Sequence, residues 1–336
     1  MTFGQLDFLC SRIPAPLCTL VGPYSINEIT GIDASGVEPQ CFARSIDLAN
    51  TVIFEVGAAF VNIAALFVIG IIVLSVRSKY TAVGRKEILD FFYLYGLLTI
   101  ASLLVDSGVV PPATKPYPYF VAAQCGLASA TCWCLLVNGF VGFQLYEDGT
   151  TLSSWIIRIV SSCGFALTFV VSLLTFQSWG GLSPTNTVGL FVVLYILNIV
   201  ALVVYVLCQA VLVLFTLQDM WPLGDIALGI FCFVAGQVLL NVFSSTICEH
   251  TKHYVDGLIF ASMCNLFTVM MIYKYWDSIT SEDLEFSVSA NAVAPPTVNP
   301  WDQKEFYDED RRSRVYANDG SEYTGSFYAL RNNATY

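Results

Sequence analysis

Seven long apolar stretches constrain this chain more than any other feature. They lie near residues 48–76, 88–110, 119–145, 155–178, 187–217, 226–247 and 255–275. A helix needs about 20 mostly apolar residues to cross the roughly 30 Å hydrocarbon layer of a bilayer. No proline lies well inside any stretch, so we expect continuous rather than hinged helices. The sequence therefore predicts an all-α fold, a polytopic membrane protein with a seven-transmembrane-helix bundle.

Composition and charge divide the chain into unlike parts. The 336 residues are 56% hydrophobic and 12% charged, whereas soluble domains average about 45–50% apolar and 25% charged. The net charge is -11, and the last 60 residues, with 11 acidic and 5 basic side chains, contribute -6 of it. We expect 1–47 to be a lumenal N-terminal segment, 48–276 a seven-helix transmembrane domain and 277–336 a disordered acidic cytosolic tail. The seven apolar stretches make the lipid bilayer an expected partner. Nucleic acid is not an expected partner, because no basic stripe is present.

The distribution of Lys and Arg predicts the orientation in the membrane, because short cytoplasmic loops carry an excess of both. One side of a seven-span arrangement holds Arg77, Lys79, Arg85, Lys86, Arg158, Lys274 and five basic residues of the tail. The other side holds Arg12, Arg44, Lys115 and Lys252. We therefore expect a lumenal or extracellular N-terminus and a cytosolic C-terminus.

Four of the eleven cysteines lie outside the spans and on the expected lumenal side: Cys10, Cys18, Cys41 and Cys248. Disulfides persist in oxidising compartments, and four cysteines permit two bridges in three possible pairings. The sequence does not separate these pairings. The alternative is four free thiols.

Acidic side chains near the lumenal ends of the spans form a second candidate cluster. At 100° per residue, Asp47, Thr51, Glu55 and Asn62 share one face of a helix that begins near residue 48. Asp106 and Asp256 lie at the same end of other spans. The candidate intramembrane polar network is Arg44, Asp47, Glu55, Asn62, Asp106 and Asp256, with Lys252 as a second basic partner. We favour a fold-stabilising network, and the alternative is a site for a proton or a cation.

The third span carries a ridge of small groups at every fourth position: Ala122, Gly126, Ala130, Cys134, Asn138 and Gly142. Such ridges let neighbouring helices approach closely and supply packing energy that lipid does not. The pattern predicts a central position for this span in the bundle. A ligand groove is the alternative interpretation.

The residues give no support to catalysis, and we expect no catalytic residue, cofactor or metal. Intramembrane zinc hydrolases need about three protein ligands, but the only two histidines, His250 and His253, share one loop. The run from Cys248 to His253 resembles a metal site only weakly, and a solvated loop is favoured. Rhodopsin-like receptors carry an acidic-Arg-Tyr triplet after the third span and Asn-Pro-x-x-Tyr in the seventh, where this chain has QLYEDGTT and VMMIYKYWD. Other receptor classes and transporters remain open.

Several segments between residues 41 and 286 together resemble the fungal chitin synthase export chaperone family. They are CFARSIDLANTVIFEVGAAFVNIAAL (41–66), KYTAVGRKE (79–87), VDSGVVPP (105–112), YPYFVAAQCGLA (117–128), YEDGTT (146–151), FVAGQVL (233–239), ICEHTKHYVDGLIF (247–260) and YKYWDSITSEDLEF (273–286). Their length and order make the likeness more specific than any single motif.

The resemblance implies a multi-pass endoplasmic reticulum membrane protein without enzymatic activity of its own. Such a protein binds a polytopic chitin synthase, supports its folding and lets it leave for the cell surface, which serves cell wall chitin synthesis. The acidic tail, with Asp283-Leu284-Glu285 resembling a diacidic export signal, suits contact with the client or with export coat components. The rival hypothesis is a seven-helix receptor or transporter for a small ligand that enters near Glu55.

Overall fold

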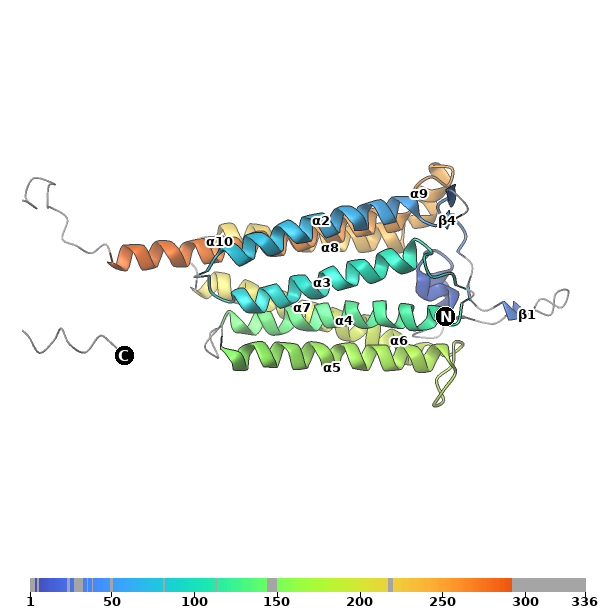
Figure 1. Ribbon diagram of the computed structural model, residues 1–336, viewed down its shortest axis with the longest axis horizontal. Helices are drawn as coiled ribbons and strands as arrows, with labels where there is room; N and C mark the ends of the chain where they lie inside the picture. Colours follow the sequence, from blue (N-terminus) through green and yellow to red (C-terminus); the bar gives the residue numbers. More distant parts are fainter. Residues whose placement is uncertain are drawn as a thin grey trace, which may run out of the picture. The chain divides into compact units, whose positions relative to one another are not determined.

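The computed structural model describes most of the chain up to the end of the last helix (Figure 1). The described residues are 4, 6–22, 25–26, 33–34, 36–37, 39–48, 51–80, 82–112, 114–143, 150–216 and 220–291. By internal contacts the chain separates into two units, Met1–Asp283 and Leu284–Tyr336. The fold below is that of the first unit, and the expected disorder of the tail beyond 291 lies outside the described residues.

The prediction of seven membrane-spanning helices is confirmed. Within the described residues, seven helices are long and apolar enough to cross a membrane. They are α2 (Val56–Ser78), α3 (Arg85–Asp106), α4 (Tyr117–Val141), α5 (Thr151–Phe176), the combined span Val188–Phe215, α8 (Trp221–Asn241) and Gly257–Thr280 of α10. Helix α4 packs against α3, α5 and α7 (Leu197–Thr216), so the third span is central.

Local sequence signals set several helix starts. The Thr150 side chain accepts a hydrogen bond from Ser153 N at 3.3 Å and so caps α5. Prolines at the first helical positions begin α4 and α8, where a missing N–H costs nothing. Gly84 precedes α3 with a φ of 66°, a conformation that favours glycine.

The first span begins later than the apolar pattern suggests. Residues Ile46–Leu48 (β3) and Thr51–Ile53 (β4) form an antiparallel pair, and α2 begins only at Val56. The run of β-branched residues around Val52 favours a strand over a helix. The expected helical stripe is therefore wrong, because Asp47 and Thr51 lie in strands and Glu55 precedes the helix.

The fifth span is helical without a break, as expected, but it includes one π-helical turn. It consists of α6 (Val188–Phe191), a π-helical turn (η2, Val192–Ile196) and α7 (Leu197–Thr216). Directly after the π turn, Asn198 Nδ2 donates to Leu194 O at 2.7 Å and to Ser129 Oγ of α4 at 2.8 Å. The wide turn therefore lies beside a polar contact between helices rather than at a proline.

The N-terminal segment covers one end of the bundle, which we call the cap end. It contains α1 (Asp7–Cys10), η1 (Pro16–Thr19) and the short pair β1 (Ser25–Ile26) and β2 (Asp33–Ala34). Its side chains Leu6, Cys10, Leu17, Cys18 and Val21 are buried in one cluster with residues of α3 to α6. Leu6 N donates to Thr187 Oγ1 at 3.1 Å, and Gly22 N donates to Pro184 O at 2.9 Å. Residues 6–22 thus form a packed cap on the bundle.

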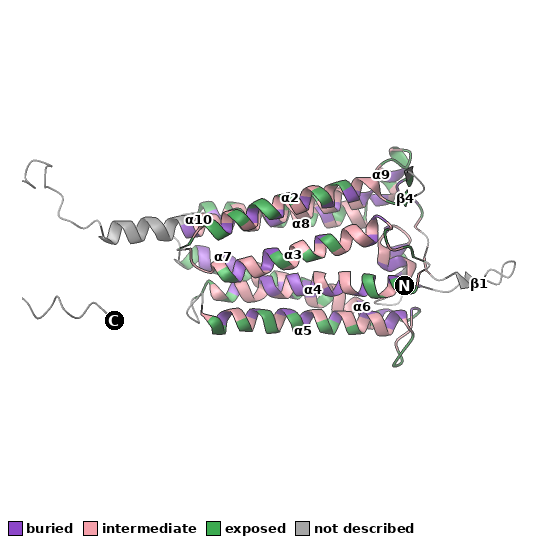
Figure 2. Cartoon of the chain, in the orientation of Figure 1, coloured by how far each residue is buried: buried purple, intermediate pink, exposed green. Residues whose placement is uncertain are grey.

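A second core lies toward the opposite end of the bundle. It groups Val76, Phe92, Cys134, Leu135 and Ile157 from four helices. Figure 2 shows that buried, intermediate and exposed stretches alternate along the helices of the bundle. Most of the exposed apolar side chains lie on membrane-spanning helices, where they suit contact with lipid.

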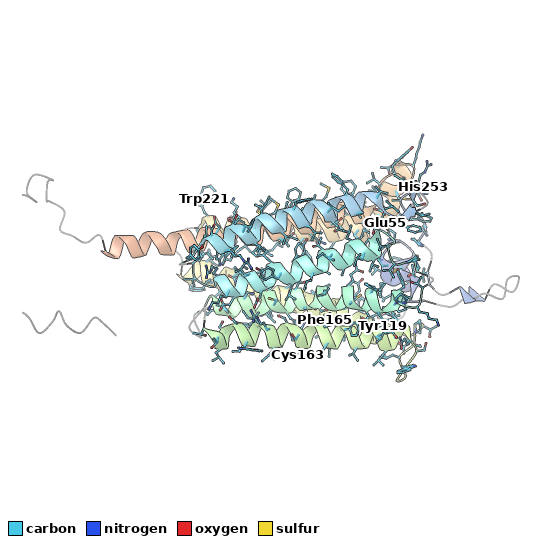
Figure 3. All side chains as sticks on the ribbon, in the orientation of Figure 1. Glu55, Tyr119, Cys163, Phe165, Trp221 and His253 are labelled. Atoms are coloured by element: carbon cyan, nitrogen blue, oxygen red, sulfur yellow. A yellow bond between two sulfur atoms is a disulfide. The ribbon has the colours of Figure 1, made fainter. Side chains whose placement is uncertain are left out.

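Exposed aromatic side chains lie near both ends of the spans. Trp179 follows α5 and Tyr254 precedes α10, both at the cap end. Tyr80 follows α2 and Trp221, labelled in Figure 3, begins α8 at the opposite end. Trp and Tyr concentrate at the two membrane–water interfaces because their rings are apolar and their tips are polar. Their placement agrees with a bundle that crosses one bilayer.

The last helix is longer than the apolar stretch within it. Helix α10 extends over Gly257–Asn291, so it continues 15 residues past the expected boundary at 276. The motif Asp283-Leu284-Glu285 lies within this helix, and its side chains are outside the described residues.

Candidate functional site

Three carboxylates from three helix ends gather beneath the cap. Glu55 precedes α2, Asp106 ends α3 and Asp256 precedes α10. Burial raises the pKa of Glu55 well above its ordinary value, and the charges of Asp256 and Asp106 raise it further. Burial also raises the pKa of Asp256, which is 0% exposed. The cluster therefore favours protonated carboxyls more than water would.

Each carboxylate keeps one oxygen without a hydrogen-bond partner among the described residues. These atoms are Glu55 Oε2, Asp106 Oδ1 and Asp256 Oδ2. Asn62, which is buried on α2, and Gln124 of α4 hydrogen-bond to Asp106. Asp256 Oδ1 accepts from Ile259 N at 3.4 Å and so helps begin α10. The structure thus brings Glu55, Asn62, Asp106 and Asp256 together.

The expected basic partners do not join this cluster. The Arg44 guanidinium lies over the Tyr254 ring, 5.2 Å from its centroid, and Arg44 N donates to His253 O at 2.8 Å. Lys252 is exposed in a turn. No ion pair between described residues involves the three carboxylates. The expectation of Arg44 or Lys252 as a partner is therefore corrected, and the Asp47 side chain lies outside the described residues.

The four cysteines outside the spans form two disulfides. Cys10 pairs with Cys18 within the cap, and Cys41 pairs with Cys248 across 207 residues of sequence. All four side chains are buried. His253, labelled in Figure 3 at the same end as Glu55, has its Nδ1 atom 3.2 Å from Cys41 Sγ. Spacing alone left the pairing open, because Cys41 and Cys248 meet only through the tertiary fold.

The small-residue ridge of α4 packs inside the bundle. Ala122, Gly126, Ala130 and Cys134 are buried, Asn138 is half-buried and Gly142 is exposed. A Cβ atom added at Gly126 would lie 2.9 Å from the Phe165 ring of α5, and one at Gly142 would lie 3.0 Å from Leu212 of α7. The ridge therefore serves contacts within the chain, and its buried part is not a free face for a partner.

A polar contact between three helices was not predicted from the sequence. Ser129 Oγ of α4 accepts from Thr168 Oγ1 of α5 and from Asn198 Nδ2 of α7, each at 2.8 Å. The signal that would have found it is a polar residue close to the helix face of the ridge, because Ser129 lies three residues after Gly126. Hydrogen bonds between membrane helices contribute about 0.6–2 kcal/mol each.

The end of the bundle opposite the cap is held by ion pairs between helices, which sequence reasoning also missed. Arg158 of α5 forms a two-pronged pair with Asp90 of α3 at 2.9 and 3.3 Å. Lys274 of α10 lies 3.1 Å from Asp225 of α8. Glu87 of α3 is 0% exposed, although it was not singled out as a deep charge.

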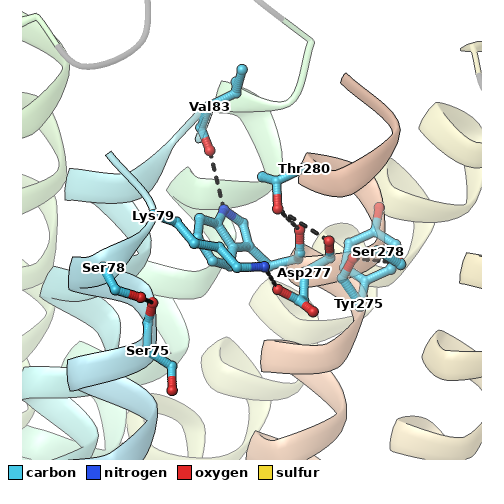
Figure 4. Close-up of polar contacts among 9 residues, drawn as sticks. Ser75, Ser78, Lys79, Val83, Tyr275, Asp277, Ser278 and Thr280 are labelled. Atoms are coloured by element: carbon cyan, nitrogen blue, oxygen red, sulfur yellow. Dashed lines mark hydrogen bonds and ion pairs between the residues drawn. The ribbon is translucent and has the colours of Figure 1, made fainter. Parts of the chain in front are cut away.

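A further contact joins the α2–α3 connection to α10 (Figure 4). Lys79 pairs with Asp277, and Trp276 Nε1 donates to Val83 O at 3.1 Å. The Lys79 ammonium also lies 5.9 Å from the centroid of the Trp276 ring. These contacts hold α10 against the α2–α3 connection at the end of its membrane span.

Two cavities of the bundle lie away from the carboxylate cluster. The larger, about 440 Å³, lies between α7, α8 and α10 and is lined mainly by apolar side chains such as Val206, Phe233 and Met271. The second, about 390 Å³, lies beside the Asp90–Arg158 pair. The larger cavity lacks the convergent polar groups that a small-molecule site normally has. The second is lined by Asp90 and Arg158 and also by Ser161.

A family model and individual relatives both match nearly the whole chain. The sequence model of the chitin synthase export chaperone family matches residues 2–290. The chain belongs to this family. A chitin synthase export chaperone of Aspergillus oryzae is 59% identical over 335 residues, covering 99% of this chain and 98% of the relative. The corresponding values are 58%, 98% and 97% for Aspergillus fumigatus, and 60%, 94% and 92% for Fusarium oxysporum.

The family match includes the cap, all seven spans and nearly the whole of α10. The resemblance of residues 41–286 to chitin synthase export chaperones is therefore confirmed, and the match extends to the cap as well. No solved structure matches the chain.

Proposed function

We propose that this chain is an endoplasmic reticulum membrane chaperone that binds a chitin synthase, assists its folding and is needed for its export to the cell surface. By this route it supports chitin synthesis in the cell wall. The observation that carries the proposal is the family membership, with relatives of 58–60% identity that are named for chitin synthase export.

The proposed mechanism is binding without catalysis. The chaperone covers polar or poorly packed membrane surface of the synthase until the synthase is assembled, and then lets it leave. Its own small-residue ridge is largely buried, so the client contacts the exposed apolar faces of the outer helices. Affinity then comes from helix packing and from interhelical hydrogen bonds.

The proposed orientation has a lumenal N-terminus and a cytosolic C-terminus. The Lys and Arg distribution supports it, and so do the two disulfides at the cap end, because disulfides persist in oxidising compartments. The C-terminal residues then lie on the side where export coat components act.

Gene deletion with imaging of a fluorescent synthase tests the proposal. We expect the synthase to be retained in the endoplasmic reticulum and wall chitin to fall, and both to recover when the full chain is restored. Normal surface delivery with unchanged chitin would refute the proposal.

The rival function, a receptor or transporter for a small ligand, gives a different result. Glu55→Gln would then abolish the response to ligand and leave synthase traffic intact. Glu55 does not line either of the two cavities described above.

A further inference from the structure

Three metal-type ligands converge at the disulfide that joins the N-terminal segment to α9 (Ser244–His250). Cys41 Sγ, Cys248 Sγ and a ring nitrogen of His253 lie within 4.8 Å of one another. His253 Nδ1 is 3.2 Å from Cys41 Sγ and 3.7 Å from Cys248 Sγ. The same Nδ1 atom lies 3.2 Å from Phe42 O, so the ring contacts a backbone carbonyl as well as both sulfurs.

Backbone hydrogen bonds on both sides of His253 fix the position of its ring. His253 N donates to Cys248 O at 3.0 Å, and His253 O accepts from Arg44 N at 2.8 Å. Lys252 and His253 have φ values of 54° and 65°, which side chains other than glycine rarely adopt. Two successive residues of this kind carry a cost in free energy that the surrounding contacts must offset. The turn therefore holds the ring against the two sulfurs.

We propose that Cys41, Cys248 and His253 form a redox-gated zinc site. In the oxidised chain the two sulfurs are bonded to each other. In the reduced chain they supply two thiolates and His253 supplies an imidazole nitrogen, leaving one of four tetrahedral positions for water or another ligand. Zinc prefers this donor set, with Zn–S and Zn–N distances of about 2.3 and 2.0–2.1 Å.

The chemistry balances with a dithiol as reductant. The dithiol gives two electrons to the Cys41–Cys248 bond and becomes a cyclic disulfide, while its two protons leave Cys41 and Cys248 as thiols. Binding of Zn²⁺ then releases those two protons, because the metal ligands are thiolates. In either state the N-terminal segment stays joined to the loop before α10, first by a covalent bond and then by the metal. This inference does not rest on the proposed function.

Zinc retention by the purified full chain tests the site. We would use a Cys10→Ser, Cys18→Ser background, so that Cys41–Cys248 is the one disulfide that reduction opens. After dithiol treatment and dialysis against zinc, we expect one zinc per reduced chain and none per oxidised chain, counted by elemental mass spectrometry. Equal retention by both forms, or none by the reduced form, would overturn the proposal.

Two histidines in the same loop provide a matched comparison. His253→Ala should lower zinc affinity by at least ~100-fold, because even loss of an outer-shell partner of a metal ligand costs about 10–100-fold, whereas His250→Ala should leave it unchanged. Equal effects of both substitutions would contradict the assignment. His253→Cys supplies a third thiolate and should retain zinc, which separates loss of a ligand from loss of the fold. Cobalt(II) in place of zinc should give the intense visible absorption of a tetrahedral site, and weak octahedral bands would count against it.

Discussion

Glu55 combines two unfavourable features at one residue. Its φ of 46° is rare for a residue with a side chain, and its Oε2 atom has no hydrogen-bond partner among the described residues. Burial and the charges of Asp256 and Asp106 raise its pKa. A proton on this carboxyl removes part of the mutual repulsion, so protonation and folding are coupled at this position.

The coupling predicts how stability changes with pH. The raised pKa of Glu55 means that the folded chain holds this proton to a higher pH than the unfolded chain does. Its contribution is therefore complete below the unfolded pKa, about 4.3, and is lost as pH rises toward the folded value. Glu55→Gln should flatten this decline and stabilise the chain at pH 8. Each pKa unit of difference corresponds to about 1.4 kcal/mol.

Thermal unfolding in detergent, followed by tryptophan fluorescence between pH 4.5 and 8, measures this effect. Glu249→Gln alters an exposed carboxylate at the same end and serves as the control. A Glu55→Gln chain whose melting temperature follows the same pH curve as the unsubstituted chain would disprove the coupling.

At this scale the sequence predicted which acids gather but not what surrounds them. Glu55, Asp106 and Asp256 meet because each lies at the same end of its span, and span ends can be read from apolar runs. Arg44 escapes the cluster because the hairpin before α2 directs it to Tyr254, and a hairpin inside an apolar run has no clear sequence signal. The pairing of Cys41 with Cys248 likewise depends on contacts far apart in sequence.

At the scale of helices, the contact of α4 with α5 depends on small groups. A Cβ at Gly126 would meet the Phe165 ring at 2.9 Å and the Phe165 carbonyl oxygen at 3.2 Å. Gly126→Leu should therefore separate the two helices and destabilise the fold by about 1–3 kcal/mol, the usual range for overpacking. Gly70→Leu on α2 is the matched control, because nothing lies within 4 Å of that position.

Labelling of buried thiols measures this loss, because Cys125 and Cys134 of α4 are buried and free. Gly126→Leu should speed their reaction with a thiol reagent on heating, and Gly70→Leu should not. Equal rates in the two variants would show that the ridge does not limit packing.

The polar contact beside the π turn gives a second prediction about the helices. Asn198→Ala removes the hydrogen bond to Ser129 and should cost about 1 kcal/mol, within the range for such bonds in membranes. Asn241→Ala is the control, because Asn241 Nδ2 donates at 2.7 Å to Gln237 O of its own helix. Comparable melting temperatures for the two variants would argue against a stabilising role of the contact between helices.

The apolar pattern of the sequence predicts the spans but not their local backbone structure. Length and hydropathy predict that a span exists, because they reflect transfer into lipid. They do not predict the β3–β4 pair or the π turn, since both depend on which backbone groups find partners in the folded chain. The ridge on α4 was predicted, because every-fourth spacing places residues on one helix face.

At the scale of the whole molecule, the two ends of the bundle differ in charge compensation. Ion pairs between helices lie at one end, and three carboxylates without an ion-pair partner among the described residues lie at the other. The Lys and Arg excess at the first end supports a cytosolic position for it. The seven spans and this excess were predictable from the sequence. The folded cap was not, because its apolar runs are short and its sequence resembles that of a loop.

Glycosylation tagging tests the orientation. An Asn-x-Thr acceptor fused to the N-terminus should be glycosylated and shift in mobility after endoglycosidase treatment, because the proposed N-terminus is lumenal. The natural acceptor at Asn333 should stay unmodified. A glycan at Asn333 and none on the N-terminal tag would reverse the orientation.

The Cys41–Cys248 bond also has a topological consequence. It closes a covalent ring that contains α2 through α8, so six of the seven spans lie within one loop of chain. A machine that withdraws the protein from the membrane as a single strand would have to pass two strands through its pore at this crosslink. Removal of the intact protein for degradation therefore requires prior cleavage of that bond, and the lifetime of the folded chaperone becomes linked to the thiol chemistry of its compartment.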